Sequence, residues 1–130
     1  MALVWKVKIK RKVDYSDEVD RVVRRAVWEA VKETAIAIEN DVKGGPHAAP
    51  YRTGNLRRSY HVELMEAKLT ARVGSDDRIA PYAPYVELGT SRQRAQPHLR
   101  PAGEAQRTAF AQRAATNLRA AMKGFQKARR

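Results

Sequence analysis

Three histidines are the first candidates for chemistry, because an imidazole ring can bind a metal ion or move a proton near neutral pH. They are His47, His61 and His98. None has a second ligand at a usable spacing, and His47 and His98 stand beside prolines in segments of loop composition. A structural zinc site needs four protein ligands and a catalytic one three, and the chain has no cysteine. The sequence therefore predicts no metal site.

Patterns that would support catalysis by a nucleophile or a carboxylate pair are equally weak. Ser59 has no evident base and no orienting acid near it in the sequence. Asp76 and Asp77 are adjacent acids in a turn, where carboxylates usually bond local backbone amides. The chain has no GxSxG, HExxH, Walker or dinucleotide-binding glycine pattern. We predict that the protein is not an enzyme.

Glu87 is the most informative acidic residue, because it lies in the most apolar part of its segment, between Tyr85 and Leu88. A carboxylate in such a place must be solvated, capped by backbone donors or paired with a cation. Arg57, Arg58 and Arg100 are candidate partners. The sequence favours a structural role in which Glu87 ties the irregular loop to the preceding hairpin.

The elements that must position these residues begin with a strand and a long helix. Trp5, Val7 and Ile9 alternate with lysines, which predicts a half-buried strand, and its all-lysine outer face suits an edge position. Apolar residues then recur at helical spacing to about residue 42. Asp14 or Ser16 can cap this helix, and Gly44, Gly45 and Pro46 end it. Trp28 falls near its polar side, as a boundary or an interface residue.

The rest of the chain predicts a hairpin and two further helices. Residues 43–55 have loop composition, and two alternating stretches follow, with Tyr60, Val62 and Leu64 inward in the first and Leu69, Ala71 and Val73 inward in the second. Tyr82, Tyr85 and Val86 allow a short helix that Gly89 stops. Pro101 opens the last helix at its first position, with one apolar stripe: Phe110, Ala114, Leu118, Ala121 and Phe125. This order predicts an α+β fold, with a small single sheet packed on helices.

Length and charge describe one basic domain. The 130 residues fit a single domain spanning 1–130, with a core at about 3–123 and a basic tail, 124–130, predicted to be disordered. No apolar run approaches the ~20 residues of a membrane span. The net charge is +12: residues 1–13 hold five basic residues, residues 14–91 hold 11 basic and 13 acidic residues, and residues 92–130 hold 10 basic residues against Glu104. Cationic ends of this kind serve acidic protein surfaces, nucleic acid or solubility.

The last helix carries a basic face that is open to two interpretations. The face consists of Arg113, Arg119, Lys123 and Lys127. Its aromatic residues, Phe110 and Phe125, lie on the opposite, core-like side, which is unlike a helix that reads DNA sequence. Attraction to the nucleic-acid backbone stays possible, so a small basic nucleic-acid-binding domain is the alternative function.

Two segments resemble one protein family. The stretch APYRTGNLRRSY, residues 49–60, is similar to a pattern of proline followed by Thr-Gly-x-Leu-x-x-Ser. The stretch YAPYVELGTSRQRAQPHLRPA, residues 82–102, resembles Tyr-Ala-x-Tyr-Val-Glu-aromatic-Gly-Thr, a variable loop and Pro-x-Leu-Arg-Pro-Ala. The matching positions are Thr53, Gly54, Leu56, Ser59, Tyr82, Tyr85, Glu87, Gly89, Thr90, Pro97, Leu99, Arg100 and Pro101. In order and spacing, over residues 16–123, these resemble the neck, or tail-completion, proteins of long-tailed phages with non-contractile tails. Leu88 and His98 depart from the pattern, because each stands where an aromatic residue is common.

The resemblance implies a structural virion protein that joins a head to a tail, without a cofactor or catalysis. Its partners would be other neck and tail proteins and further copies of itself, with six copies by family analogy and a monomer before assembly. It would lie in the virion, and in the host cytoplasm during assembly, with at most non-specific contact to DNA and none to membrane. Residues 43–55 and 81–100 would be the loops that order against neighbours.

Overall fold

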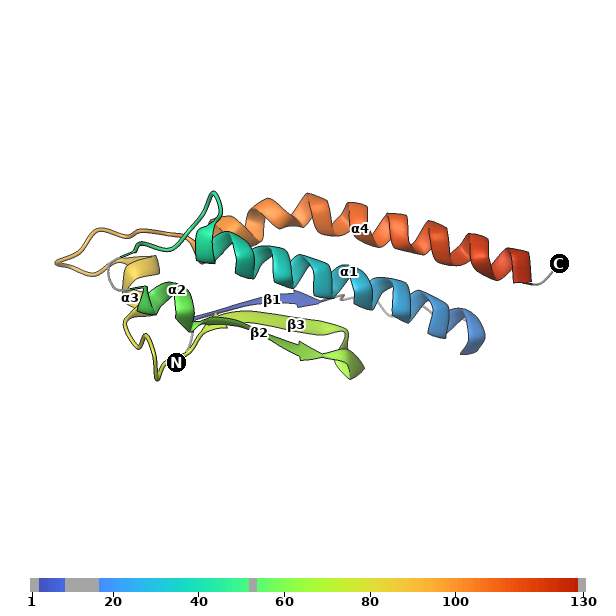
Figure 1. The fold of residues 1–130 in the computed structure, drawn as a ribbon, viewed down its shortest axis with the longest axis horizontal. Helices are drawn as coiled ribbons and strands as arrows, with labels where there is room; N and C mark the ends of the chain where they lie inside the picture. Colours follow the sequence, from blue (N-terminus) through green and yellow to red (C-terminus); the bar gives the residue numbers. More distant parts are fainter. Residues whose placement is uncertain (1–2, 9–16, 52–53, 129–130) are drawn as a thin grey trace.

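The computed structural model describes residues 3–8, 17–51 and 54–128. In chain order its elements are β1 (Val4–Lys8), α1 (Asp17–Gly44), α2 (Asn55–Ser59), β2 (Tyr60–Met65), the 3₁₀ turn η1 (Glu66–Lys68), β3 (Thr70–Ser75), α3 (Ala83–Leu88) and α4 (Leu99–Ala128). One three-stranded antiparallel sheet packs on the helices, so the predicted α+β class is confirmed (Figure 1). The candidate helix caps Asp14 and Ser16 lie outside the described residues.

The sheet has the strand order β1-β3-β2, so β1 is an edge strand as predicted. Its alternation is also confirmed where the structure describes it: Val7 is buried, whereas Lys6 and Lys8 are exposed. Ile9 lies outside the described residues. The register pairs Val7 with Ala71 of β3, and both belong to the core.

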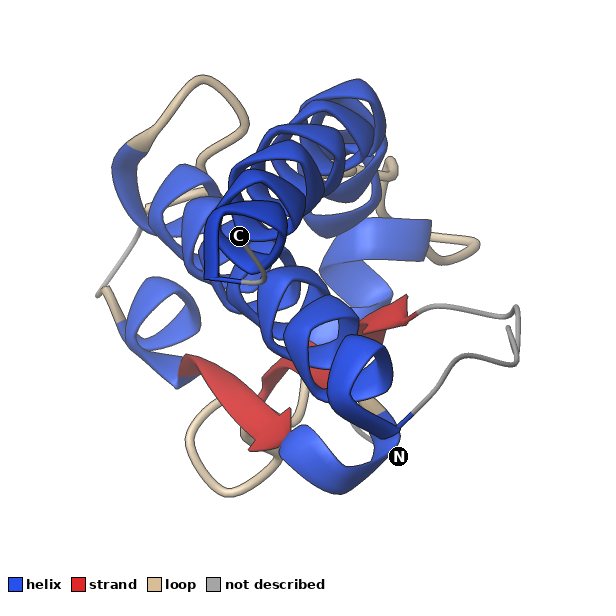
Figure 2. Ribbon diagram, turned by 90° about the vertical axis from the view of Figure 1, so that its right-hand side faces the viewer, coloured by secondary structure: helices blue, strands red, loops and turns tan. Residues whose placement is uncertain are grey.

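α1 is the middle layer of the molecule. Figures 1 and 2 show α4 on one side of it and the sheet on the other. Because the helix is covered on two sides, its buried residues form a wide band, which includes Val31 and Ile38 at 0 % exposure. This burial supplies the stability that its many valines, weak helix formers, do not. Trp28 is also buried, so the prediction of a boundary or interface position is wrong; the wider band of a two-sided helix includes it.

The hairpin forms as predicted except at its turn. Tyr60, Ala71 and Val73 are buried on the helix side of the sheet. Leu69, predicted as the first inward residue of the second strand, instead lies in the turn with a φ of 49°. Its side chain still packs against the core, because the turn folds back under α1.

α4 begins two residues earlier than the sequence predicts, at Leu99 rather than Pro101. Pro101 remains within the first turn, where a missing N–H removes no helical hydrogen bond. The predicted apolar stripe is half-buried along α1, and Phe110 and Leu118 pack against the core. The helix continues to Ala128, through most of the segment predicted to be disordered.

Candidate interaction site at one end of the molecule

The two segments that carry the family resemblance meet at one end of the elongated molecule, where α2 and α3 lie (Figure 1). Gly54 precedes α2 with a φ of 81°, a left-handed conformation that favours glycine. The helix then buries Leu56 and Ser59, and the Ser59 hydroxyl donates to the Leu56 carbonyl at 2.6 Å. The Gly-x-Leu-x-x-Ser part of the pattern therefore builds a compact turn of helix. Thr53 lies outside the described residues.

Glu87 caps the start of α4. Its Oε2 accepts hydrogen bonds from the backbone N–H groups of His98 at 2.8 Å and Leu99 at 3.1 Å, and Oε1 accepts from that of Arg100 at 2.9 Å. The carboxylate is 4 % exposed, so backbone donors and the positive end of the helix compensate its buried charge. This cap explains why α4 can begin at Leu99.

The three arginines predicted as candidate charge partners of Glu87 bind other groups with their side chains, so that prediction is wrong. Arg57 donates from Nε to the Ala49 carbonyl at 2.7 Å, and Arg58 donates to the side chain of Asn55. Arg100 reaches Glu87 only through its backbone, while its side chain pairs with Glu104 at 3.2 Å. Three converging backbone donors are sufficient here because they lie at a helix terminus.

His98 braces this cap against the sheet. Its Nε2 is hydrogen-bonded to the Tyr60 hydroxyl, and its Nδ1 lies 2.9 Å from the Gln96 carbonyl and 3.1 Å from Oε2 of Glu87. Since both neighbours of Nδ1 are acceptors, Nδ1 carries a proton, and Nε2 is the ring nitrogen that meets the Tyr60 hydroxyl. Burial, and secondarily Glu87, raises the pKa of Tyr60, which keeps its hydroxyl a donor.

The Tyr60–His98–Glu87 chain has the composition of a catalytic relay, but its side chains are buried and no substrate could reach them. Tyr60 and His98 are each 1 % exposed, and their rings meet edge to face with centroids 5.5 Å apart. The chain ties β2 to the loop before α4 and to α3. Glu87 therefore does join the irregular loop to the hairpin, through His98.

The loop between α3 and α4 is held by Gly89 and Thr90. Gly89 has a φ of 78°, and a Cβ there would lie 2.7 Å from the backbone nitrogen of Ala95. The Thr90 hydroxyl accepts from the N–H groups of Arg92 at 3.2 Å and Gln93 at 3.0 Å. Pro97 is exposed just before the buried His98. The Gly-Thr pair therefore shapes the loop.

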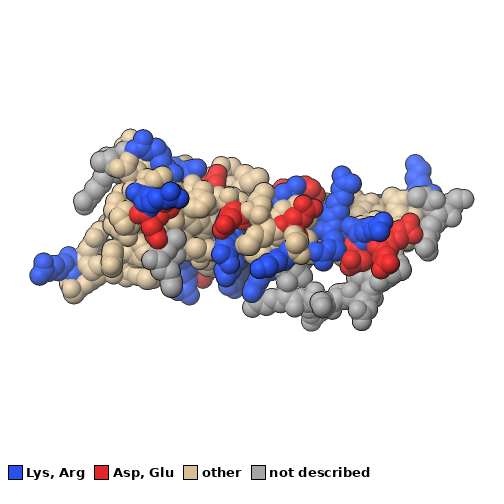
Figure 3. Space-filling view, turned by 90° about the horizontal axis from the view of Figure 1, so that it is seen from below, with Lys and Arg blue, Asp and Glu red and all other residues tan. Residues whose placement is uncertain are grey.

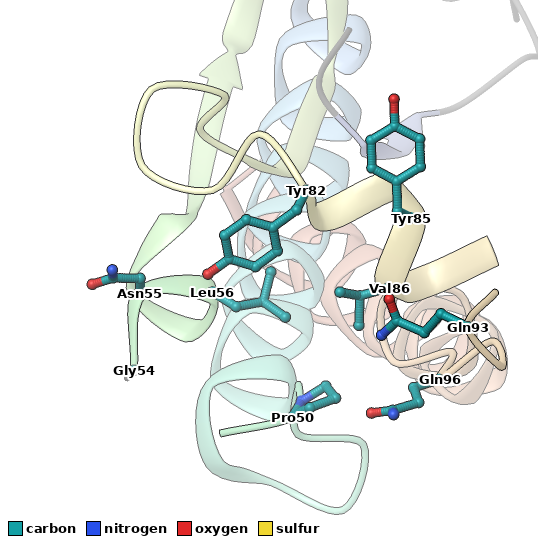
Figure 4. Close-up of a pocket in the computed structure, with 9 residues that line it drawn as sticks. All are labelled: Pro50, Gly54, Asn55, Leu56, Tyr82, Tyr85, Val86, Gln93 and Gln96. Atoms are coloured by element: carbon teal, nitrogen blue, oxygen red, sulfur yellow. The ribbon is translucent and has the colours of Figure 1, made fainter. Parts of the chain in front are cut away.

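A groove of about 450 Å³ opens between these parts (Figure 4). All of its lining residues lie within the two family segments: Pro50, Gly54, Asn55, Leu56, Tyr82, Tyr85, Val86, Gln93 and Gln96. In Figure 4 the Tyr82 ring lies over Leu56, whereas the Tyr85 ring points away from Leu56 and from the other labelled side chains. Tyr85 is 60 % exposed and its neighbour Leu88 71 %. Exposed aromatic and apolar side chains around a groove are typical of a protein interaction site.

The basic face of α4 lies toward the opposite end of the molecule. Only part of this face is exposed to solvent. Arg119, Lys123 and Lys127 are exposed. Arg113 instead points to α1, where Nη1 donates to the Thr34 hydroxyl at 3.0 Å and, within α4, to Gln106 at 2.9 Å. On the face seen in Figure 3, basic and acidic side chains are interspersed along the molecule.

The remaining candidates for chemistry have structural partners. His47 approaches Oδ2 of Asp41 with its Nδ1 at 2.7 Å, and its backbone N–H donates to Oδ1 at the same distance, which closes the end of α1. Asp76 accepts from the backbone N–H of Arg78 at 2.8 Å, as predicted for a turn carboxylate. Within the described part of the chain, no group of three or more histidines and acids lies close enough to hold a metal ion. None of the described helices is long and apolar enough to cross a membrane.

Comparison of the sequence with known protein families identifies the family of this chain. Residues 8–89 match the sequence profile of the family described as "Bacteriophage HK97-gp10, putative tail-component", and the chain belongs to this family. The match includes the first family segment and the second as far as Gly89. No curated protein and no solved structure matches the chain. Family membership supports a structural role in the phage tail, and hence a place in the virion, rather than catalysis.

Proposed function

We propose that the protein is a neck protein that completes the tail and joins it to the head of a phage with a long non-contractile tail. The observation that carries this proposal is the groove end, where both family segments build a fixed scaffold beneath exposed aromatic and apolar side chains. A joint between two assemblies needs a rigid core that presents such a contact surface. Glu87 and His98 supply the rigidity from beneath.

The surface around the groove has the composition of an energetically important interface. Tyr51, Tyr82 and Tyr85 are exposed there, and the guanidinium of Arg57 stacks 5.1 Å from the Tyr51 ring centre. Tyrosine and arginine provide large contact area and polar anchors at the centres of interfaces. In this proposal the groove end meets a neighbouring neck or tail protein. Copies of the chain form a ring, six by family analogy, after assembly from monomers in the host cytoplasm.

Complementation of a gene deletion tests this function. Lysates without the gene should contain separate heads and tails by electron microscopy, and the wild-type gene should restore joined particles. The double variant Tyr85→Ser with Leu88→Ser should fold normally, because both side chains are exposed, yet fail to restore joining. Ile36→Ser is the matched control, since Ile36 is 48 % exposed but does not line the groove. Intact infectious particles from the deletion lysate would refute the proposal.

The alternative, a nucleic-acid-binding domain, makes a different prediction about salt. A +12 chain will adhere to DNA at low salt under either hypothesis. The neck function predicts weak, sequence-blind binding that falls steeply with salt. Sub-micromolar binding that persists at ~0.15 M salt, and that is lost on changing Arg119, Lys123 and Lys127 to glutamine, would favour the alternative. Arg113 is left unchanged because it stabilises the α1–α4 contact.

A further inference from the structure

Within the described part of the chain, both edges of the sheet are unpaired. β1 and β2 each pair with β3 on one side, and among the described residues no further strand lies beside either. An unpaired edge presents a row of N–H and C=O groups that can pair with another strand. The two edges of this sheet differ in both charge and shape.

The β1 edge combines an apolar groove with positive charge. A hollow of about 380 Å³ lies beside β1 and α4, with Trp5, Val7 and Phe110 among its apolar lining residues. The charged residues that line it, in the part of the chain that the structure describes, are all cations: Lys6, Lys8 and Arg107. This edge suits a strand that presents an apolar side chain on one face and an acid on the other.

The β2 edge has that pattern. Leu64 pairs with Ala71 in the register, so it lies on the helix side of the sheet, yet it is 48 % exposed because nothing described covers the edge there. Glu63 lies on the opposite face, level with Arg72 of β3 and Lys6 of β1. The arginines of α1 near this edge, Arg21 and Arg24 among them, lie beside the η1 turn rather than along the strand.

We infer that copies of this chain associate by pairing the β2 edge of one copy with the β1 edge of the next, which extends the sheet from copy to copy. Both strands run antiparallel to β3 and hence parallel to each other, so a second copy in the same orientation brings its β1 alongside β2. Leu64 then enters the hollow beside Trp5 and Phe110, and Glu63 faces the lysines of β1. This inference rests on the ring of the proposed function and names the surface that builds it.

The charges also disfavour the symmetric alternatives. Pairing of β1 with its own counterpart would bring together the lysines of two copies, Lys6 and Lys8, and pairing of β2 with its counterpart in the register centred on Glu63 would oppose two copies of that carboxylate. Like charges directly opposite each other destabilise strand pairs. The remaining arrangement, one edge against the other, is a head-to-tail interface, which closes into a ring when its rotation permits.

Disulfide trapping tests this pairing, because the natural chain has no cysteine. Two double variants of the full chain are needed, Lys6→Cys with Glu63→Cys and Lys8→Cys with Glu63→Cys, to cover both registers. Within one copy these positions are separated by β3 and thus by about 10 Å, beyond the ~7 Å that a disulfide spans. Any disulfide therefore joins two copies. The matched control is Glu63→Cys with Lys127→Cys, which has the same number of exposed thiols.

Mild oxidation of the purified chain should give a ladder of linked copies for at least one edge pair. The single variants, Lys6→Cys or Glu63→Cys, should give little disulfide-linked dimer. Leu64→Ser added to the reactive pair should slow linking about tenfold, because it removes a buried leucine from the interface. A ladder no stronger than that of the Lys127 control, or equal dimer formation by the single variants, would overturn the inference. If sedimentation then showed an oligomeric wild-type chain, the ring would stand and only this surface would fail.

Discussion

Removal of the Glu87 carboxylate should destabilise the whole domain, because α4 begins on it. Glu87→Ala would leave three backbone N–H groups without their acceptor. A buried donor left unpaired costs about 1–3 kcal/mol, and because neighbouring losses are not additive, we expect about 3–6 kcal/mol in total. That is a large part of the roughly 5–15 kcal/mol by which domains of this size are stable.

Glu87→Gln is the sharper variant, because it keeps the shape of the side chain. One oxygen can still accept, but the amide nitrogen cannot, so at least one N–H group loses its partner and meets another donor. We expect a loss of about 2–3 kcal/mol. Glu104→Gln is the control, since the Glu104 side chain is half-exposed and pairs with Arg100 in the first turns of the same helix; it should cost less than about 0.5 kcal/mol.

Urea denaturation followed by circular dichroism measures both losses, with the midpoint shifting and the slope unchanged. Amide exchange adds a local reading, because the N–H groups of His98, Leu99 and Arg100 should lose protection first. If Glu87→Gln proved no more destabilising than Glu104→Gln, the cap would not stabilise the fold and the reasoning would be wrong.

Two further predictions follow from buried contacts. The pKa of Tyr60 is raised in the folded chain, so the unfolded chain loses that proton first; the contribution of Tyr60 to stability should be constant below ~pH 10 and then fall by about 1.4 kcal/mol per pH unit. Tyr60→Phe should remove this component, and an unchanged alkaline slope would contradict it. Gly103→Ala should destabilise by about 1–3 kcal/mol, because the new Cβ would lie 2.3 Å from the Trp5 ring, whereas Gly124→Ala on the same helix meets nothing within 4 Å and should be neutral or stabilising. Thermal melts of the two alanine variants make the comparison, and equal melting temperatures would count against it.

Much of the fold could be predicted from the sequence, since the period of its apolar residues reports which face of each element is covered. The lysine alternation around Val7 indicated an edge strand, and the Phe110 to Phe125 stripe indicated the face of α4 that meets α1. The positions of Trp28 and Arg113 were predicted wrongly, because the pattern of one helix does not show what packs against its other sides. A helical pattern shows the main apolar side, but it cannot show that α1 is covered twice, nor that Thr34 would offer a hydroxyl to an arginine on the polar side of α4.

The site was predictable in part. The sequence required that Glu87 be solvated, capped by backbone donors or paired with a cation, but it could not choose among these, because converging backbone N–H groups leave no trace in residue types. The Tyr60–His98 bridge joins residues 38 positions apart, and no local pattern reports such a contact. The one signal was the departure from the family pattern at His98, where a ring with two polar nitrogens stands in place of a purely aromatic one. No residue pattern indicated the His47–Asp41 pair, which closes the end of α1.

The unequal lengths of the layers have a mechanical consequence. α1 and α4 have 28 and 30 residues, hence lengths of about 42 and 45 Å, whereas the six-residue strands span only about 20 Å. The paired helices therefore continue well past the sheet and act as a strut with the groove near one end and the cationic residues of α4 near the other. Because α1 and α4 pack against each other, each limits the bending of the other. The length of this helix pair therefore sets the distance between a partner bound at the groove and a partner bound at the cationic end of α4.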